Sequence, residues 1–134
     1  MKPFIKWVGG KTQIIEDVLG SFPTKMKDYH EVFVGGGSVL LSVLSRELVT
    51  GKVCAYDLNG SLIALYQNIQ SQPQAVYGHL KSLYEQYEKC EGLEVNRKAE
   101  TLEEAVKSKE NYYYWIRKRF NTEKEETPER SATF

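Results

Sequence analysis

Three consecutive glycines, Gly35 to Gly37, are the feature that most constrains how this 134-residue chain can fold. A short β-type run, Tyr29 to Val34, stops at them, and an apolar run typical of a helix, Val39 to Leu44, follows with Ser38 as the predicted N-cap. Glycine permits positive φ and places no Cβ between the chain and a ligand. A strand, a glycine turn and a helix in this order indicate an α/β protein that brings its backbone close to a bound cofactor.

Hydrophobic periodicity along the chain predicts the order β-α-β-α, followed by helices only. The expected strands cover residues 29–34 and 52–56, and the expected helices cover residues 13–19, 38–49, 61–69, 74–90 and 109–120. Residues 123–130 are acidic and polar, and we expect them to be mobile. The predicted fold class is α/β, with a partial doubly wound, Rossmann-like sheet in residues 1–70 and a helical insertion in residues 71–134.

Composition and charge exclude several classes of protein. The length suggests a single domain with a real core, and the formal net charge of zero means that no global field attracts DNA or a membrane. The apolar runs are too short to span a bilayer, and no signal-peptide core is present. Cys54 and Cys90 lie in different predicted elements, so we expect reduced thiols, with Cys54 in the core of a cytoplasmic protein.

Two glycine patterns resemble nucleotide-binding motifs and fail their spacing tests. Gly9 to Thr12 ends like a phosphate-binding loop, but that loop requires a glycine where this chain has Ile5, and no strand precedes it. Gly35 to Gly37 begins like a dinucleotide fingerprint, whose third position here is Leu40 instead of a small residue. Neither a nucleotide hydrolase nor tight pyrophosphate binding is therefore favoured.

An acidic residue after the second predicted strand strengthens the case for a cofactor. Asp57 follows Gly37 by twenty residues, and a carboxylate at that place can accept two hydrogen bonds from a ribose diol. The same residues also suit a simple turn, because Asp and Asn bond readily to the local backbone. His30 and His79 have no acidic or cysteine partners at ligand spacing, so we expect no metal site.

An aromatic and basic segment near the end of the chain has two interpretations. Tyr112 to Trp115, next to Arg117, Lys118 and Arg119, could stack on bases and contact phosphates. A helix with an aromatic core face and a basic solvent face explains the same residues without nucleic acid, and it is the favoured interpretation of aromatics at helical spacing.

Four stretches together resemble the Dam-type DNA adenine-N6 methyltransferases. Pro3 to Lys11 resembles their amino-terminal cofactor motif, and Glu31 to Ser38 resembles their Glu-Pro-Phe-x-Gly-x-Gly motif. Asp57 to Asn59 resembles their acidic Asp-x-Asn motif, and Tyr113 to Asn121 is similar to the helix early in their DNA-recognition insertion. The matches follow the family's order along nearly the whole chain.

The resemblance implies an enzyme that uses S-adenosylmethionine to methylate adenine N6 in duplex DNA. Carried over by position, Lys11 would pair with the cofactor's carboxylate, with Trp7 beside it, and Asp57 would hold the ribose hydroxyls. The full implied cofactor set is Trp7, Lys11, Glu31, Phe33, Gly35, Gly37 and Asp57, and the implied DNA contacts are Arg117, Lys118 and Arg119. S-adenosylmethionine has no pyrophosphate, so the absent third glycine does not count against it.

Two departures from the family pattern bear on activity. Val32 stands where the family has proline, which alters the stiffness of the turn. The family's catalytic Asp-Pro-Pro-Tyr sequence does not occur in these 134 residues, so no catalytic residue is assigned. We therefore expect the first half of such an enzyme, with little catalysis by itself, an open strand edge, and self-association or a second chain that supplies the remainder.

Two other functions fit the residues. One is a binding module without catalysis, in which the segment from Tyr112 to Arg119 holds nucleic acid or a partner subunit. The other is half of a nicotinamide-dependent oxidoreductase built on the glycine turn and Asp57.

Overall fold

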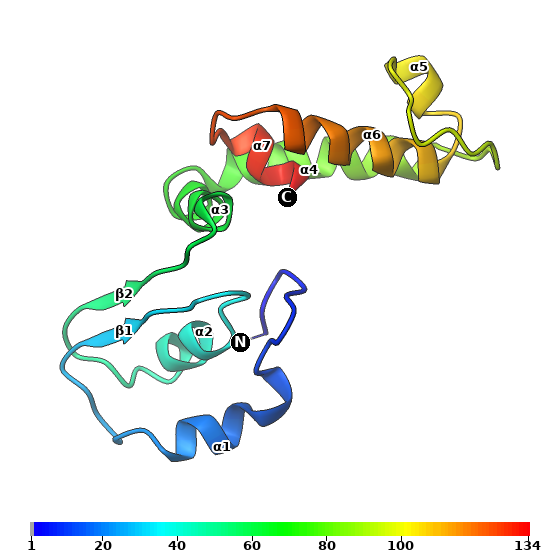
Figure 1. Ribbon diagram of the computed structural model, residues 1–134. Helices are drawn as coiled ribbons and strands as arrows, with labels where there is room; N and C mark the ends of the chain where they lie inside the picture. Colours follow the sequence, from blue (N-terminus) through cyan, green and yellow to red (C-terminus); the bar gives the residue numbers. More distant parts are fainter. Residues whose placement is uncertain (1) are drawn as a thin grey trace. The chain divides into compact units, whose positions relative to one another are not determined.

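The computed structural model describes residues 2–134, which group into two compact units (Figure 1). The amino-terminal unit ends at Gly60, and the helical unit runs from Ser61 to Phe134. The proposal that cofactor-binding residues extend to residue 70 and the DNA-recognition insertion starts at 71 stays a prediction, because the units describe packing and not ligand binding.

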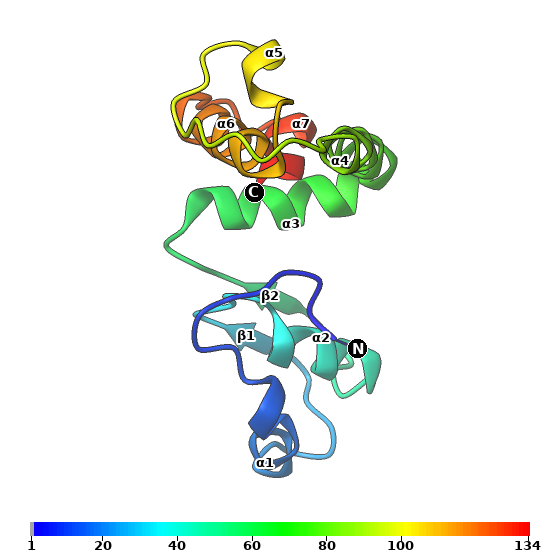
Figure 2. The ribbon, with the colours of Figure 1, turned by 90° about the vertical axis from the view of Figure 1, so that its right-hand side faces the viewer.

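The amino-terminal unit is a parallel strand pair with two helices beside it. Its elements are the short 3-10 helix η1 (Thr12–Ile14), α1 (Ile15–Gly20), β1 (Tyr29–Glu31), α2 (Ser38–Ser45) and β2 (Val53–Ala55). Tyr29 pairs with Val53 and Glu31 with Ala55, and parallel neighbours of this kind require a crossover, which α2 supplies. Figures 1 and 2 show α1 and α2 packed together on one side of the strand pair.

Both strands and α2 are shorter than the periodicity predicts. The helix ends at Ser45 because Glu47 adopts a positive φ of 51°, and the Leu48 N–H then reaches back to the Val43 carbonyl at 3.3 Å. This closing turn is typical of a glycine-terminated helix, and here a glutamate occupies the left-handed position. The apolar residues Leu48 and Val49 therefore lie beyond the helix, although their composition continues its pattern.

The helical unit consists of five helices among the residues described. They are α3 (Gly60–Ser71), α4 (Pro73–Glu88), α5 (Leu102–Ala105), α6 (Lys109–Thr122) and α7 (Pro128–Thr133). Pro73 occupies the first turn of α4 as expected, where its missing N–H costs nothing. Side-chain caps begin the later helices: Ser108 accepts from the Asn111 N–H at 3.1 Å, and Thr127 accepts from the Arg130 N–H at 3.1 Å.

An aromatic core holds α4, α5 and α6 together. Tyr112 is fully buried, donates its hydroxyl to Gln86 Oε1 at 2.7 Å, and lies 5.9 Å from the Trp115 ring, centroid to centroid. The other members of this cluster are Leu83, Tyr87, Cys90, Ala99, Ala105, Val106 and Ile116. The favoured interpretation of the aromatic segment, a core-facing helix stripe, is thus confirmed for Tyr112 and Trp115.

Residues 123–130, which we expect from their composition to be mobile, make specific contacts through Arg130. Its side chain donates to the Glu123 carbonyl at 2.6 Å and to Ser61 Oγ at 2.8 Å, and it forms an ion pair with Glu126. The guanidinium also lies 4.3 Å from the centre of the Phe120 ring. A buried charge with several partners orders a chain that its polar composition alone would leave loose.

The architecture is a mixed helix and strand arrangement with a small two-stranded parallel sheet. Among residues 2–134, no third strand joins β1 and β2, so the described residues form one β-α-β crossover. Cys54 and Cys90 are unpaired thiols, and Cys54 is only partly buried instead of lying in the core as expected. None of the helices in the described part of the chain has the length and hydropathy needed to cross a bilayer.

Candidate functional site

The glycine turn between β1 and α2 adopts a conformation that favours glycine at two positions. Gly35 has a φ of +48° and Gly37 a φ of +72°, and the Gly37 N–H closes the turn on the Val34 carbonyl at 2.8 Å. A side chain at either position would meet the steric penalty of the left-handed region. Pairing continues past the strands, since the Val34 N–H donates to the Tyr56 carbonyl at 2.9 Å.

The amino-terminal segment lies directly against this turn. A Cβ added to Gly35 would lie 2.9 Å from Trp7 Cδ1, and one added to Gly36 would lie 3.0 Å from Trp7 Cβ. The separation at Gly35 is shorter than real side chains show, and that at Gly36 is tighter than most real contacts, so the missing side chains make room for Trp7. The glycines and Trp7, separated by almost thirty residues in sequence, therefore form one surface.

Ser38 connects Lys11 to the turn and does not act as the N-cap. Helix α2 begins at Ser38, so its N-cap is Gly37, which has no side chain to bond to the first amides. The Ser38 hydroxyl oxygen instead accepts the backbone N–H of Lys11 at 3.1 Å. The Lys11 ammonium is exposed and donates to the Gly9 carbonyl at 2.7 Å, within its own loop.

Asp57 reaches the same turn from the end of β2. One carboxylate oxygen accepts the Gly35 N–H at 3.0 Å, and the other accepts the Asn59 N–H at 2.9 Å. The second bond is the local turn that the Asp-Leu-Asn-Gly sequence favours, and the first joins residues that are 22 positions apart. Trp7 and Asp57 thus both contact Gly35, and three of the predicted cofactor residues come together.

Glu31 lies at the end of β1, beneath the first turn of α2. Its carboxylate accepts the Tyr29 hydroxyl at 3.0 Å and the backbone N–H of Leu40. Burial raises the pKa of the Glu31 carboxyl above its ordinary value, and these two hydrogen bonds lower it in part. Burial next to this carboxylate also raises the pKa of the Tyr29 hydroxyl. Glu31 therefore accepts an amide of the first turn of α2, because the N-cap of this helix is a glycine without a side chain that could accept it.

Phe33 and Leu58 present large apolar surfaces around the turn. Phe33 is 78% exposed and Leu58, next to Asp57, is 97% exposed. Exposed apolar side chains beside positioned polar groups are typical of a ligand site that holds a flat, partly apolar molecule. Sequence reasoning named Phe33 and omitted Leu58, although the apolar residue in the Asp57 turn was visible in the sequence.

An open cavity of about 500 Å³ lies between the amino-terminal segment and the glycine turn. Its lining residues are Lys2, Pro3, Ile5, Lys6, Trp7, Gly9, Gly10, Thr12, Gln13, Gly36 and Ser38. The volume falls within the range of small-molecule sites. Of the predicted cofactor residues, Trp7 belongs to this lining, whereas Gly35 and Asp57 do not.

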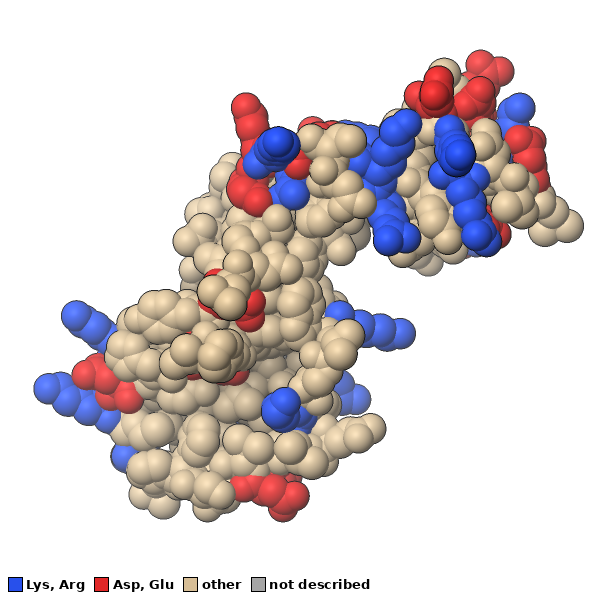
Figure 3. Space-filling view, in the orientation of Figure 1, with Lys and Arg blue, Asp and Glu red and all other residues tan. Residues whose placement is uncertain are grey.

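The basic residues of α6 differ in how they are engaged. Arg119 forms ion pairs with Glu123 at 3.1 Å and Glu129 at 2.8 Å, and its guanidinium lies 5.1 Å from the centre of the Trp115 ring. Arg117 and Lys118 are exposed. Figure 3 shows lysine and arginine side chains gathered over the part of the helical unit that contains α6. The charge of Arg119 is therefore compensated within the fold, and Arg117 and Lys118 are the stronger candidates for phosphate contacts.

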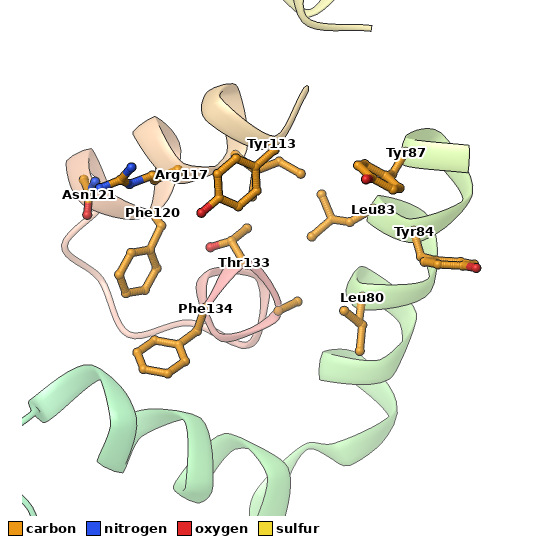
Figure 4. A pocket seen from close by; sticks show the side chains of 12 residues that line it. Leu80, Leu83, Tyr84, Tyr87, Tyr113, Arg117, Phe120, Asn121, Thr133 and Phe134 are labelled. Atoms are coloured by element: carbon orange, nitrogen blue, oxygen red, sulfur yellow. The ribbon is translucent and has the colours of Figure 1, made fainter. Parts of the chain in front are cut away.

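A second cavity, of about 440 Å³, lies within the helical unit. Figure 4 shows the side chains that line it, which come from α4, α6 and α7 and are mostly apolar or aromatic. Tyr113, Arg117 and Asn121 follow one another at helical spacing along the α6 side of the cavity. No local sequence pattern indicates this cavity, because its walls meet only after α7 packs on α4.

The described residues contain no cluster of side chains suited to bind a metal ion. No group of three or more His, Cys, Asp or Glu side chains in residues 2–134 could hold an ion. His30 stacks on Tyr56 at 6.1 Å between ring centroids, with Nδ1 3.3 Å from the Tyr56 hydroxyl. His30 therefore contacts an aromatic residue next to the glycine turn.

Comparison with known proteins identifies the family. The model of the D12 class N6 adenine-specific DNA methyltransferases matches residues 7–134, and the chain belongs to this family. The resemblance found in the glycine turn and the amino-terminal motif is thereby confirmed.

Three characterised relatives illustrate the extent of the match. The chain is 31% identical over 134 residues to the type II methyltransferase M.MjaIII of Methanocaldococcus jannaschii, which covers 96% of this chain and 41% of that protein. It is 29% identical over 133 residues to the DNA adenine methylase of Haemophilus influenzae, covering 99% of this chain and 38% of the relative. It is 36% identical over 75 residues to the DNA adenine methylase of Vibrio cholerae, and this match covers 55% of this chain and 24% of the relative.

The chain spans about two fifths of the length of the relatives that it matches from end to end. No solved structure matches the chain.

Proposed function

We propose that this chain forms the S-adenosylmethionine site of a DNA adenine-N6 methyltransferase. The observation that carries the proposal is the approach of Trp7, Asp57 and the Ser38-bound Lys11 segment to one glycine turn at the end of a parallel strand. Ligands of α/β proteins bind at the carboxyl ends of parallel strands. Because β1 and β2 are parallel, their carboxyl ends lie at the same edge of the strand pair, next to the glycine turn and Asp57. On this proposal the β1-α2-β2 crossover is part of a doubly wound sheet.

Asp57 is suited to hold the ribose of the cofactor. Each carboxylate oxygen has already accepted one backbone N–H, and each has a second lone pair available for a hydroxyl donor. The two backbone bonds fix the orientation of the carboxylate before a ligand arrives, which reduces the entropy lost on binding. The exposed side chains of Phe33 and Leu58 are available to contact the flat adenine base.

Trp7 and Lys11 would hold the amino-acid end of the cofactor. The Lys11 ammonium bonds only to an exposed carbonyl of its own loop, a weak contact that a carboxylate can replace with a charge-assisted bond. Glu31 would raise the negative potential near the turn, which a positively charged sulfonium tolerates. The cofactor would supply the methyl group, and these residues would hold the cofactor in place and orient it.

The proposed substrate is adenine in double-stranded DNA. Because N6 takes part in base pairing and stacking, an enzyme that modifies it must extrude the base from the duplex. Arg117 and Lys118 on the exposed face of α6 would contribute phosphate contacts, which supply affinity and register without sequence information. A non-catalytic nucleic-acid-binding module would use the same two side chains.

Calorimetric titration with S-adenosylmethionine tests the proposed cofactor. Asp57→Asn should weaken binding at least tenfold, because the amide cannot accept at both positions that the carboxylate now serves. Asp28→Asn is the matched control: Asp28 accepts the Lys52 N–H at 2.7 Å in the same unit, away from the glycine turn, and its loss should change the affinity less than twofold. Binding of NAD in place of S-adenosylmethionine would overturn the proposal in favour of an oxidoreductase.

Salt-dependent DNA binding tests the second part of the proposal. Arg117→Ala and Lys118→Ala should each lower the slope of log affinity against log salt by about one. Thr122→Ala, at the exposed end of the same helix, should leave the slope unchanged. An unchanged slope in both basic variants would remove these residues from the interface.

A further inference from the structure

A directional bond between distant residues joins the amino-terminal segment from Lys2 to Lys11, here called the arm, to the residue that follows the glycine turn. The Lys11 N–H donates to the Ser38 hydroxyl oxygen at 3.1 Å, across 27 positions of sequence. Ser38 is only 7% exposed, so water competes little for this bond. The Lys11 ammonium and the Gly10 N–H bond within the arm, to the Gly9 and Trp7 carbonyls, and the Lys11 carbonyl accepts the Ile14 N–H at the start of the first helical turn.

The arm needs such an anchor because its backbone is flexible. Gly9 and Gly10 directly precede Lys11, and Gly9 has a φ of +75°. Two successive glycines lose more conformational entropy on ordering than any other pair of residues. A bond on the residue immediately after them fixes the end of the loop and therefore the place of Trp7, whose indole touches Gly35.

Ser38 is available for this purpose because of the glycine turn. A serine at the start of a helix usually bonds to its own helix, but here the N-cap is Gly37 and Ser38 is the first helical residue. The Ser38 carbonyl accepts the Ser42 hydroxyl at 2.8 Å, one turn along the same helix. The Ser38 hydroxyl thus points away from the helix ladder and toward the arm.

We propose that Ser38 is a positioning residue of the methyl-donor site, which holds the arm, and with it Trp7 and Lys11, against the glycine turn. This inference rests on the proposed function. It assigns no contact between Ser38 and the reacting atoms. The hydroxyl acts through the Lys11 amide, and its loss should release the arm while leaving α2 folded.

Ser38→Ala and Ser42→Ala form a matched pair for the test. Both serines lie in α2, both are 7% exposed, and each loses one hydroxyl in the variant. Only Ser38 contacts the arm, so a purely structural effect of removing a buried hydroxyl should be the same in both. Each variant is made in the full chain, in a Trp115→Phe background that leaves Trp7 as the sole tryptophan.

Three measurements follow the arm and the site separately. Trypsin cleavage after Lys6 and Lys11, timed by mass spectrometry without cofactor, should be about fivefold faster in Ser38→Ala than in Ser42→Ala. Acrylamide should quench Trp7 fluorescence more in Ser38→Ala. Calorimetry should show S-adenosylmethionine binding about fivefold weaker in Ser38→Ala and within twofold of the parent chain in Ser42→Ala.

The outcomes separate this inference from the proposed function. Equal cleavage, quenching and affinity in the two variants would overturn the role of Ser38 even if the parent chain binds S-adenosylmethionine. Release of the arm without a change in affinity would also overturn it. If the parent chain does not bind S-adenosylmethionine, the proposed function fails and the positioning role fails with it, whereas selective release of the arm would still show that Ser38 anchors it.

Discussion

The two units of this chain are held together in different ways. In the amino-terminal unit, Trp7, Ser38 and Asp57 meet at a glycine turn through contacts between segments more than twenty residues apart. In the helical unit, local caps begin the helices and a buried aromatic cluster around Tyr112 joins them. Local caps begin the helices of the helical unit, and packing between the helices joins them, whereas the candidate site depends on particular approaches between distant segments.

The difference predicts where substitutions affect stability and where they affect binding. Loss of packing in the helical unit should lower its free energy of unfolding by several kcal/mol. Loss of one contact in the amino-terminal unit should alter the ligand site first. One tryptophan lies in each unit, Trp7 and Trp115, so single-tryptophan variants report on each unit separately.

Tyr112→Ala should have the largest effect. Removing a fully buried ring and its bond to Gln86 should cost about 4 kcal/mol. Denaturant unfolding followed by Trp115 fluorescence, in a Trp7→Phe background, measures it. Tyr113→Ala is the control, because Tyr113 is 56% exposed and its loss should cost less than about 1 kcal/mol. Equal losses in the two variants would show that the aromatic cluster is not the source of stability.

Gly92→Ala should have the next largest effect on stability. It tests whether the close approach of the Gly92 and Lys107 backbones contributes to the stability of the helical unit. A Cβ there would collide with the Lys107 carbonyl oxygen, beside the Leu93–Ser108 bridge, and should cost about 2 kcal/mol. Gly78→Ala in α4 meets nothing within 4 Å and should stabilise the unit by about 1 kcal/mol. The same Trp115 unfolding measurement applies, and a neutral Gly92→Ala would contradict the close approach.

Gly35→Ala should weaken S-adenosylmethionine binding about tenfold, because it combines a positive φ with a collision against the Trp7 ring. Calorimetric titration gives the affinity. Gly20→Ala, where a Cβ meets no atom within 4 Å, should bind as the parent chain does. Unchanged affinity in Gly35→Ala would mean that the indole and the turn need not touch for binding.

Glu31→Gln should have the smallest effect, visible as a change in pH dependence. Burial raises the pKa of Glu31 in the folded chain, so this carboxyl favours folding below its unfolded pKa and loses that contribution as pH rises through the folded value. The variant should therefore show a flatter stability profile over that window, by roughly 0.5 kcal/mol or less, because the group is half-exposed. Thermal unfolding monitored by Trp7 at several pH values, with the exposed Glu16→Gln as control, detects it. A steeper profile in Glu31→Gln would reverse the assigned sign.

Much of the fold was predictable where the signals are local. Pro73 marked the start of α4, the periodicity from Lys109 to Phe120 marked α6, and the parallel crossover followed from the strand, glycine and helix order. The end of α2 was not predictable, because Glu47 adopts a left-handed conformation that sequence normally assigns to glycine. The contacts of residues 123–130 were also missed, because two of the partners of Arg130, Ser61 and Phe120, come from other helices.

The candidate site divides in the same way. Trp7, Gly35 and Asp57 were named from residue type and motif order, and the structure brings them together, while their role in cofactor binding stays a prediction. Ser38 was identified with the wrong local role, since an N-cap preference is a local rule and its actual partner is 27 positions away.

By itself, the sequence determined the glycine turn, helices α3, α4 and α6 of the helical unit, and the family to which the chain belongs. These depend on backbone freedom, hydrophobic periodicity and residue order, which act over a few neighbouring positions or are visible as motifs. Only the tertiary structure decided that the Trp7 indole fills the space above Gly35, that Asp57 holds the Gly35 amide, and that Ser38 receives Lys11. Steric fit and hydrogen-bond direction between distant segments depend on where the folded backbone places them, and no local pattern encodes that position.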